Sequence, residues 1–185
     1  MLCARVLTAT LAVLCLALAA PRQAVAGGLI ISELRAGFDL HNIDGAEGEN
    51  GFDTVLEVYF AKPDWRFPDP MLQHVLRPRT FIGFSANDAG DTNELFAGFA
   101  WQMQLSDSAF LETSFGGAVH DGPLDDPTYA SFGCRANFRE SAGLGFKLTP
   151  HWQLLTEINH MSNANLCGRN RGLTNAGVRL GYVFD

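Results

Sequence analysis

Apolar and polar residues alternate through most of the chain from about residue 33 onward. Successive side chains of a β-strand point to opposite faces, so this period of two predicts strands. The alternation occurs in stretches of roughly ten residues, the length of a membrane-crossing strand, at 33–41, 52–61, 78–85, 93–105, 109–119, 136–148, 152–162 and 174–184. Eight strands of this length form the smallest usual membrane barrel.

The two faces of these strands differ, and the difference separates two kinds of barrel. One face is apolar, and the other carries Glu33, Arg35, Asp39, Asp53, Glu57, Glu94, Gln102, Glu112, Arg139, Lys147 and Glu157. A lipocalin-type barrel keeps an apolar lumen, whereas an outer-membrane barrel has a polar interior beneath a lipid-facing apolar band. We therefore predict an all-β fold, an eight-stranded antiparallel transmembrane β-barrel of the outer membrane. After residue 27 no apolar run is long enough to predict a helical span.

The first 26 residues have the pattern of a secretory signal peptide. Arg5 precedes an apolar run over 6–20, and Ala24-Val25-Ala26 provides the small residues that a signal peptidase needs. The alternative is a helical membrane anchor, but the run is short for one. We therefore expect residues 1–26 to be removed on export to the outer membrane, and residues 27–185 to form a single barrel domain.

Charge and cysteine content limit the partners of the exported chain. The signal contains two of the 13 basic residues and none of the 20 acidic ones, which leaves a formal net charge of −9 after cleavage. This balance argues against a nucleic-acid partner. Two cysteines, Cys134 and Cys167, remain. Without a nearby His pair they make a poor zinc site, so neither a metal nor another cofactor is expected.

The strand order places the loops near 42–51, 86–92, 120–133 and 163–173 at the outer end if the N-terminus is periplasmic. Cys134 and Cys167 then lie on neighbouring loops, which makes them a disulfide candidate in an oxidising compartment, with two free thiols as the alternative. The segment 63–77 is long for a periplasmic turn and has room for a short helix.

His160 and Ser162 are two residues apart near the end of one predicted strand. Their side chains therefore share a face, about 6.5 to 7 Å apart along the chain. The imidazole can accept the serine proton while the hydroxyl attacks an ester carbonyl, and can return it to the leaving alkoxide. Both positions continue the apolar series of their strand, so the pair faces lipid and favours a membrane lipid as substrate. The spacing alone also fits a polar pair at the membrane interface with no chemistry.

Three runs near the C-terminus carry a recognisable pattern: His160-Met-Ser162-Asn163-Ala164-Asn-Leu166, Asn170-Arg-Gly172-Leu and Gly177-Val-Arg179-Leu-Gly181-Tyr-Val-Phe184. Together they resemble the signature of the PagL-type lipid A 3-O-deacylases, also called acyloxyacyl hydrolase-like. The resemblance implies an outer-membrane serine esterase that removes an acyl chain from lipid A, and only the resemblance suggests the 3-O position. It also implies that Ser162 is the nucleophile, His160 the general base and Asn163 an oxyanion contributor beside backbone N–H groups.

The third member of the implied triad is missing from its place. The family pattern has an acid 12 residues after the serine, and Thr174 stands there. If 136–148 and 152–162 form a hairpin, paired residue numbers sum to 300, which puts Glu140 opposite His160 on the lipid-facing side. A glutamate there is costly without a purpose. We predict Glu140 as the orienting acid; the alternatives are a simple dyad, contact of Glu140 with headgroup water, or its pairing with Arg135.

The remaining polar residues are less informative. Arg169 and Arg171 are candidates for contacts with lipid A phosphates at the outer rim, or for ordinary ion pairs with Asp125 and Asp126. Three histidines have no partner at a recognisable spacing and are expected to be solvated: His41, His74 and His120.

The favoured function is hydrolysis of an acyl ester of lipid A, within lipopolysaccharide of the outer leaflet. One alternative is a non-enzymatic barrel, structural or adhesin-like, in which the motif is inert. Another is a phospholipase that uses the same dyad. A small porin is disfavoured, because eight strands leave little lumen for a channel. Pairing of two barrels into a homodimer stays open.

Overall fold

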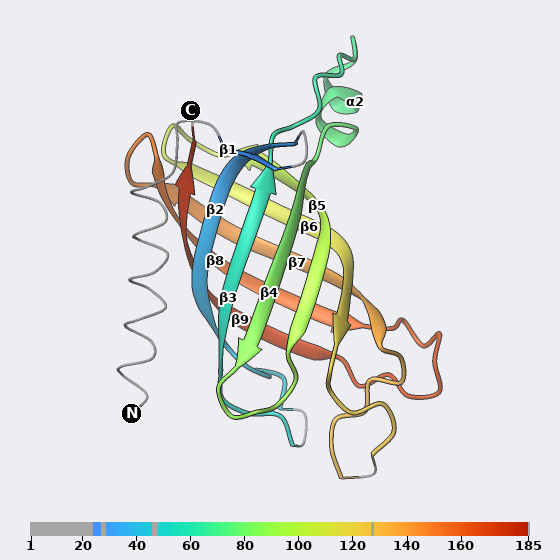
Figure 1. The fold of residues 1–185 in the computed structure, drawn as a ribbon. Coiled ribbons are helices and arrows are strands. Elements are labelled where there is room, and N and C mark those ends of the chain that lie inside the picture. The colour runs from blue at the N-terminus through green and yellow to red at the C-terminus, as the bar shows by residue number, and fades with distance from the viewer. Residues whose placement is uncertain (1–23, 27–28, 46–47, 127, 185) are drawn as a thin grey trace.

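Eight long antiparallel strands close into a barrel in a computed structural model that describes residues 24–26, 29–45, 48–126 and 128–184 (Figure 1). Each strand pairs with the next, and β2 also pairs with β9, which closes the sheet. The predicted all-β, eight-stranded barrel is therefore confirmed. The long strands are β2 (Leu29–Leu40), β3 (Phe52–Phe60), β4 (Arg79–Asn87), β5 (Glu94–Gln104), β6 (Ala109–His120), β7 (Ala136–Lys147), β8 (Trp152–Ser162) and β9 (Leu173–Val183).

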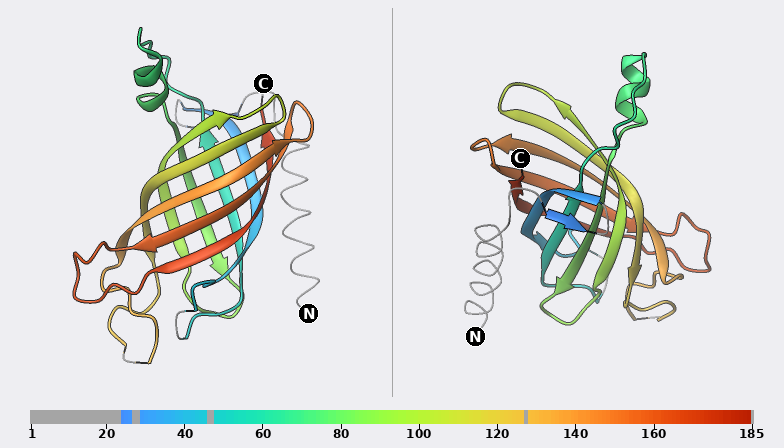
Figure 2. Two further views of the ribbon diagram at one scale, coloured as in Figure 1. Left: turned by 180° about the vertical axis from the view of Figure 1, so that it is seen from behind. Right: turned by 45° about the horizontal axis from the view of Figure 1, so that its top comes forward.

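The barrel has two different ends. The connections over 41–51, 88–93, 121–135 and 163–172 gather at one end, which the two views of Figure 2 also show. Outer-membrane barrels have short turns on the periplasmic side, and two of the three connections at the other end, over 105–108 and 148–151, are short, so we refer to the first end as the extracellular end. The other end holds the connections over 61–78, 105–108 and 148–151.

Two short elements, a strand and a helix, lie at the periplasmic end. Strand β1 (Ala24–Ala26) pairs with the start of β2, and helix α2 (Pro70–Val75) lies in the β3–β4 connection, where a short helix had room to form. Asp69 caps α2 by accepting the backbone N–H of Leu72 at 2.8 Å. No helix among the described residues is long and apolar enough to cross a membrane. The predicted signal peptide lies outside the described residues apart from β1, so its cleavage stays a prediction.

The strand boundaries follow the alternation closely except at the first strand, which starts at Leu29 rather than near residue 33. The run Leu29-Ile30-Ile31 is apolar without alternation, so the pattern did not mark it as a strand. A register irregularity between Ile31 and Glu33 accompanies this change of pattern. Such an extra residue shifts the side-chain alternation by one position.

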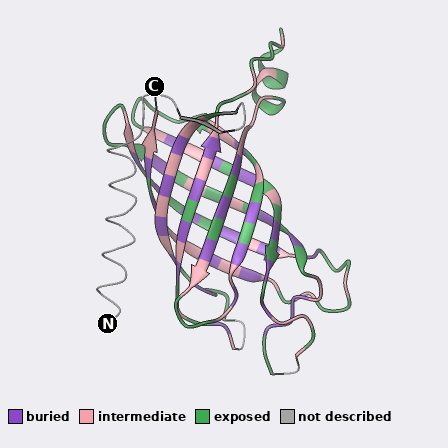
Figure 3. Cartoon of the chain, viewed as in Figure 1, coloured by how far each residue is buried: buried purple, intermediate pink, exposed green. Residues whose placement is uncertain are grey.

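Burial alternates along every long strand, as Figure 3 shows. On β2 the charged Glu33, Arg35 and Asp39 are buried inside the barrel, and on β8 Ile158 is exposed outside it. A buried charge must be paired or hydrogen-bonded, whereas an exposed apolar residue is stable against lipid. The polar-inside arrangement predicted from the sequence is therefore present.

Ion pairs fill the lumen. Arg35 donates to Glu112 at 2.6 Å, and Arg79 bridges Glu33 and Glu112. Farther along, Arg179 donates to both carboxylate oxygens of Asp39, at 2.6 and 2.8 Å. We refer to these side chains as the luminal charge network. Because they occupy the interior of a narrow barrel, the structure is that of a filled barrel rather than an open porin.

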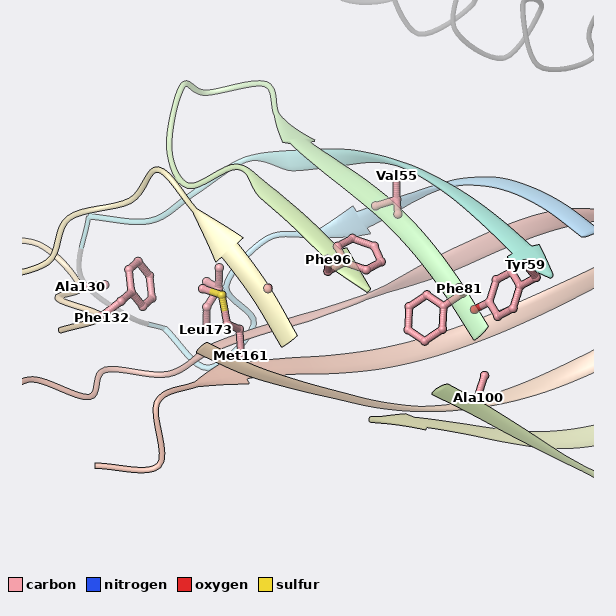
Figure 4. Packing of buried hydrophobic residues seen from close by; sticks show 10 residues of the cluster. Val55, Tyr59, Phe81, Phe96, Ala100, Ala130, Phe132, Met161 and Leu173 are labelled. Atoms are coloured by element: carbon pink, nitrogen blue, oxygen red, sulfur yellow. The ribbon is translucent and has the colours of Figure 1, made fainter. Parts of the chain in front are cut away.

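Part of the buried apolar cluster lies near the extracellular end, at the left of Figure 4. It contains Ala130 and Phe132 from the β6–β7 loop, with Met161 of β8 and Leu173 of β9. Met161 and Leu173 face each other across the β8–β9 ladder and are completely buried. Their inward packing fixes the ends of both strands, so the alternating outward side chains at these ends are held in place.

Candidate active site

His160 and Ser162 occupy the last outward positions of β8. The inward residues on either side, Asn159, Met161 and Asn163, are buried, while His160 and Ser162 are half-buried. The two side chains thus share the outer face at the extracellular end. Ser162 pairs with Phe138 of β7, and β9 begins at Leu173, one position short of Ser162. The serine therefore stands at a rim, with strand on one side and loop on the other.

Thr174 lies directly opposite His160 on β9 and binds its ring. The His160 Nδ1 atom is 2.8 Å from Thr174 Oγ1, and the Thr174 hydroxyl donates to Asp44 Oδ2 at 3.1 Å. Asp44 comes from the β2–β3 loop, 130 residues away in sequence. It had no sequence signal of its own, because only the closure of the barrel between β2 and β9 brings its loop to this strand.

Glu140 lies on the other side of His160. The β7–β8 register pairs Glu140 with His160, as the hairpin argument predicted. Glu140 is exposed, and no hydrogen bond or ion pair joins it to His160 within the part of the chain that the structure describes. Arg135 donates to the carbonyl oxygens of His120 and Gly122. The position of Glu140 is thus confirmed, and its role as orienting acid stays a prediction.

The imidazole of His160 packs against the loop before β9. A Cβ atom added at Gly172 would lie 2.8 Å from His160 Nε2 and still closer to Cε1. Real Cβ atoms almost never approach so closely, so a side chain at residue 172 would push the ring aside. Gly172, a residue of the recognised C-terminal pattern, leaves the space that the ring occupies.

Asn163 holds the loop that follows Ser162. Its side-chain N–H groups donate to the backbone carbonyls of Phe132, at 2.6 Å, and Arg169. A role in an oxyanion hole requires that one of these bonds be exchanged for substrate, so the predicted role of Asn163 remains untested. The next two residues, Ala164 and Asn165, are exposed and have φ of 53° and 62°. Two successive non-glycine residues in the left-handed region store strain, which is typical of functional sites.

A disulfide joins the two loops nearest the site. Cys134 and Cys167 are bonded, with 5.9 Å between their Cα atoms and 33 residues of separation. The predicted disulfide is thus confirmed. It links the β6–β7 loop to the β8–β9 loop, and so restrains the segment between Ser162 and Thr174.

A cleft of about 620 Å³ opens among the β2–β3, β6–β7 and β8–β9 loops. Arg169 forms an ion pair with Asp125 at 2.9 Å, and Arg171 lies 3.8 Å from Asp44. Both arginines are exposed, so they remain accessible to an anion. The ion pair of Arg169 was one of the two alternatives read from the sequence, and contact with phosphate stays untested. The residues that line the cleft are Gly45, Asp126, Tyr129, Ala130, Ser131, Arg169, Asn170 and Arg171.

Two of the three histidines expected to be solvated are buried, so that expectation was wrong for them. His41 lies between Asp53, at 2.9 Å, and Glu49, at 2.8 Å. Burial opposes its charge, but these two hydrogen bonds prevail and raise the pKa of His41 to about 10. His120 packs inside with its Nε2 atom 2.7 Å from the Cys134 carbonyl oxygen. Loop folding creates these contacts, so spacing along a strand did not reveal them.

The fold and the site together define the class of this protein. The protein is an outer-membrane β-barrel with a filled lumen and a serine–histidine pair on its outer rim. The family model for lipid A 3-O-deacylase (PagL) matches residues 58–183. The chain therefore belongs to the PagL family, and its location is the outer membrane. No match was found among curated proteins.

Solved structures support the same fold. The chain is similar to the crystal structure of the outer membrane enzyme PagL, with a TM-score of 0.60, 20% identity, and coverage of 82% of this chain and 99% of that one. It is also similar to Neisserial surface protein A, with a TM-score of 0.55, 10% identity, and coverage of 82% and 96%. A designed transmembrane β-barrel matches with a TM-score of 0.50, 15% identity, and coverage of 82% and 95%. At these sequence identities the structural similarity shows the barrel fold and does not show the chemistry.

Proposed function

We propose that this protein is a serine esterase of the outer membrane that hydrolyses an ester-linked acyl chain of lipid A, at the 3-O position, and releases a fatty acid. The observation that carries the proposal is the outward His160–Ser162 pair at the rim, with His160 held at Nδ1 by Thr174. A ring held at Nδ1 presents Nε2 as the free nitrogen. Since the pair faces the bilayer, its substrate is a lipid.

The chemistry follows from the free nitrogen. The Ser162 oxygen attacks the acyl carbonyl carbon while its proton passes to His160 Nε2, and a tetrahedral intermediate forms. The intermediate collapses to an acyl-serine, and the sugar oxygen leaves with the proton from the imidazolium. Water then attacks the acyl-serine with His160 again as the base, which frees the fatty acid and restores the serine hydroxyl.

The developing oxyanion needs donors close to Ser162. We assign this role to backbone N–H groups of the strained Ala164–Asn165 turn, where no N–H donation from either residue is found within the described chain. The Asn163 amide contributes if one of its present bonds to the loop carbonyls is released when substrate binds. In either case Asn163 keeps the turn in place.

The surroundings of Ser162 suit both the acyl chain and the phosphorylated sugar of lipid A. Phe138 lies opposite Ser162, and its ring stacks on that of Phe115 with 6.0 Å between centroids, both exposed on the lipid-facing side. An acyl chain can lie along these rings. On the aqueous side, Arg169 and Arg171 line the cleft and are exposed, and we propose that they contact phosphate groups of lipid A.

Glu140 is our candidate for the acid that orients His160, because the β7–β8 register pairs the two residues. Without a hydrogen bond to the ring, it acts through its negative charge, which stabilises the imidazolium across the β7–β8 pair. Substitution by Gln keeps the shape and removes the charge. We therefore expect Glu140→Gln to lower the rate and to leave substrate affinity unchanged.

The test is the lipid A mass profile of a bacterium with defined lipid A that expresses the protein. We expect wild type to produce lipid A lighter by one 3-O-linked acyl chain, and Ser162→Ala and His160→Ala to leave it unchanged. Thr156→Ala is the matched control, because Thr156 is exposed on the same face of β8. Unchanged lipid A with folded wild type favours the inert barrel, and release of fatty acid from glycerophospholipids alone favours a phospholipase.

A further inference from the structure

We infer that Asp44 is a positioning residue for His160, acting through the hydroxyl of Thr174, and that it supplies the negative charge that threonine at residue 174 lacks. The inference rests on the proposed function, since it concerns the same serine–histidine pair. Its basis is the chain of contacts from His160 Nδ1 to Thr174 Oγ1, at 2.8 Å, and from Thr174 Oγ1 to Asp44 Oδ2, at 3.1 Å.

Counting protons along this chain determines the state of the imidazole. A carboxylate only accepts hydrogen bonds, so the single hydroxyl proton of Thr174 points to Asp44. The Thr174 oxygen must then accept the proton on His160 Nδ1. The neutral ring therefore carries its proton on Nδ1 and leaves Nε2 unprotonated, which is the tautomer that a general base for Ser162 requires.

The backbone around Asp44 holds the carboxylate in place. The N–H of Ile43 donates to the Thr174 carbonyl at 2.8 Å, and that of Asn42 donates to Asn175 Oδ1 at 2.8 Å. Both bonds tie the start of the β2–β3 loop to the strand that carries Thr174. The position of Asp44 beside Thr174 is thus set by two hydrogen bonds outside its own side chain.

A tight turn adds to this restraint. The N–H of Gly45 donates to the Asn42 carbonyl at 3.2 Å, and the two residues have φ of 75° and 57°. A left-handed conformation at a non-glycine residue has a cost. Asn42 adopts this strained conformation in the turn that carries Asp44. Such strain is typical of functional sites.

The charged groups around the ring come from each neighbouring element. Glu140 faces His160 from β7, Asp44 approaches through Thr174 of β9, and Arg171 lies 3.8 Å from Asp44 on the loop before β9. Glu140 has no hydrogen bond to the ring within the described residues, so it can add negative charge but cannot choose the tautomer. Asp44 can do both.

Removal of Asp44 should have a specific effect. In Asp44→Ala the Thr174 hydroxyl is free to turn and donate to Nδ1, which puts the ring proton on Nε2 and blocks proton transfer from Ser162. We expect kcat to fall about 10- to 100-fold with KM unchanged, less than the effect of a wrong tautomer in a fully buried triad. Asp44→Asn keeps one accepting oxygen for the Thr174 hydroxyl and loses the charge. Its kcat should therefore lie between those of wild type and Asp44→Ala, and the acidic limb of its pH profile should move to lower pH.

The experiment combines two measurements on the full chain folded in detergent micelles. One is deacylation of lipid A, with kcat and KM separated. The other is nitrogen-15 NMR of the His160 ring, assigned by the signal lost in His160→Gln, which reports which nitrogen carries the proton without any need for activity. The variants are Asp44→Ala, Asp44→Asn, Thr174→Val and Thr174→Ser, with Asp107→Ala as an exposed aspartate control at the periplasmic end.

The expected result is an Nδ1-protonated ring in wild type, Thr174→Ser and Asp107→Ala, and a loss of that preference in Asp44→Ala and Thr174→Val, with a parallel fall in kcat. An active wild type whose kcat and tautomer are unchanged by Asp44→Ala overturns the inference and leaves the proposed esterase intact. An inactive wild type overturns the proposed function, and the NMR measurement then still decides whether Asp44 sets the tautomer.

Discussion

The lumen and the outer rim both contain polar side chains, but the two regions use them differently. In the lumen, Arg35 and Arg179 are almost completely buried and each contacts several carboxylates. At the rim, His160 and Ser162 are half-buried, and the hydrogen bond of the ring to Thr174 is the contact that orients the pair. Lumen charges thus pair with one another, whereas the rim pair keeps an imidazole nitrogen and a hydroxyl available.

The difference separates polar residues that stabilise the fold from polar residues that support the reaction. A buried charge with a removed partner is strongly destabilising, so the luminal network is tied to the stability of the barrel. A polar group on the lipid-facing side contributes little to folding and carries a cost. We therefore expect substitutions in the lumen to change the free energy of unfolding, and substitutions at the rim to change activity.

The largest expected effect is at the rim. His160→Gln removes the proton acceptor of Ser162, so kcat should fall about 10⁴-fold or more. The free energy of unfolding should change by about 1 kcal/mol or less, because the half-buried ring contributes one side-chain hydrogen bond, to Thr174. Lipid A deacylation and urea unfolding of the same preparation measure both quantities. A matching loss of stability would contradict the separation of the two regions.

The next effect belongs to the lumen. Arg179→Met leaves Asp39 and Glu57 without their shared cation, so the free energy of unfolding should fall by about 3 to 5 kcal/mol. Arg169→Met is the matched control, because its ion pair with Asp125 is exposed and should be worth about 1 kcal/mol or less. Urea unfolding monitored by tryptophan fluorescence gives both values, and equal values would show that burial does not decide the outcome.

A smaller effect tests the packing of the imidazole. Gly172→Ala places a Cβ atom against the His160 ring, and a displacement of this kind should lower kcat about 10- to 100-fold. Gly168→Ala, in the same loop, has no atom within 4 Å of the added Cβ. It should therefore behave as wild type. Equal activity of the two variants would mean that the ring position does not limit the reaction.

The smallest effect comes from His41 at the extracellular end. Hydrogen bonds to Asp53 and Glu49 raise its pKa from about 6.5 to about 10. Its charged form therefore stabilises the fold fully below pH 6.5, and this contribution is lost as pH rises through 10. Between pH 7 and pH 10 the melting temperature of wild type should fall by a few degrees more than that of His41→Gln. Parallel curves for the two proteins would contradict the raised pKa.

Much of the fold was predictable because it depends on local alternation. A period of two assigns each side chain to a face, so the inward position of Arg35 and the outward position of Ser162 followed from the sequence. The short turn over 149–151 also determined the β7–β8 register, which put Glu140 opposite His160. These inferences needed only neighbouring residues.

The contacts that could not be predicted from the sequence either cross the β2–β9 pair that closes the barrel or arise in loops. Asp44 meets Thr174 only because β2 pairs with β9, and the turn at Asn42 and Gly45 then directs its carboxylate. His41 meets Glu49 because a loop folds back over it. Such contacts depend on closure and on loop geometry, which no periodicity encodes.

Covalent labelling of Ser162 tests the central claim most directly. A lipid-like fluorophosphonate reacts with a serine that an adjacent base activates, and peptide mass spectrometry identifies the labelled residue. We predict that wild-type protein in lipid A-containing micelles is labelled at Ser162, that His160→Gln is labelled far more slowly, and that prior labelling abolishes deacylation. Deacylation that persists after Ser162 is fully labelled, or in Ser162→Ala, would contradict the account.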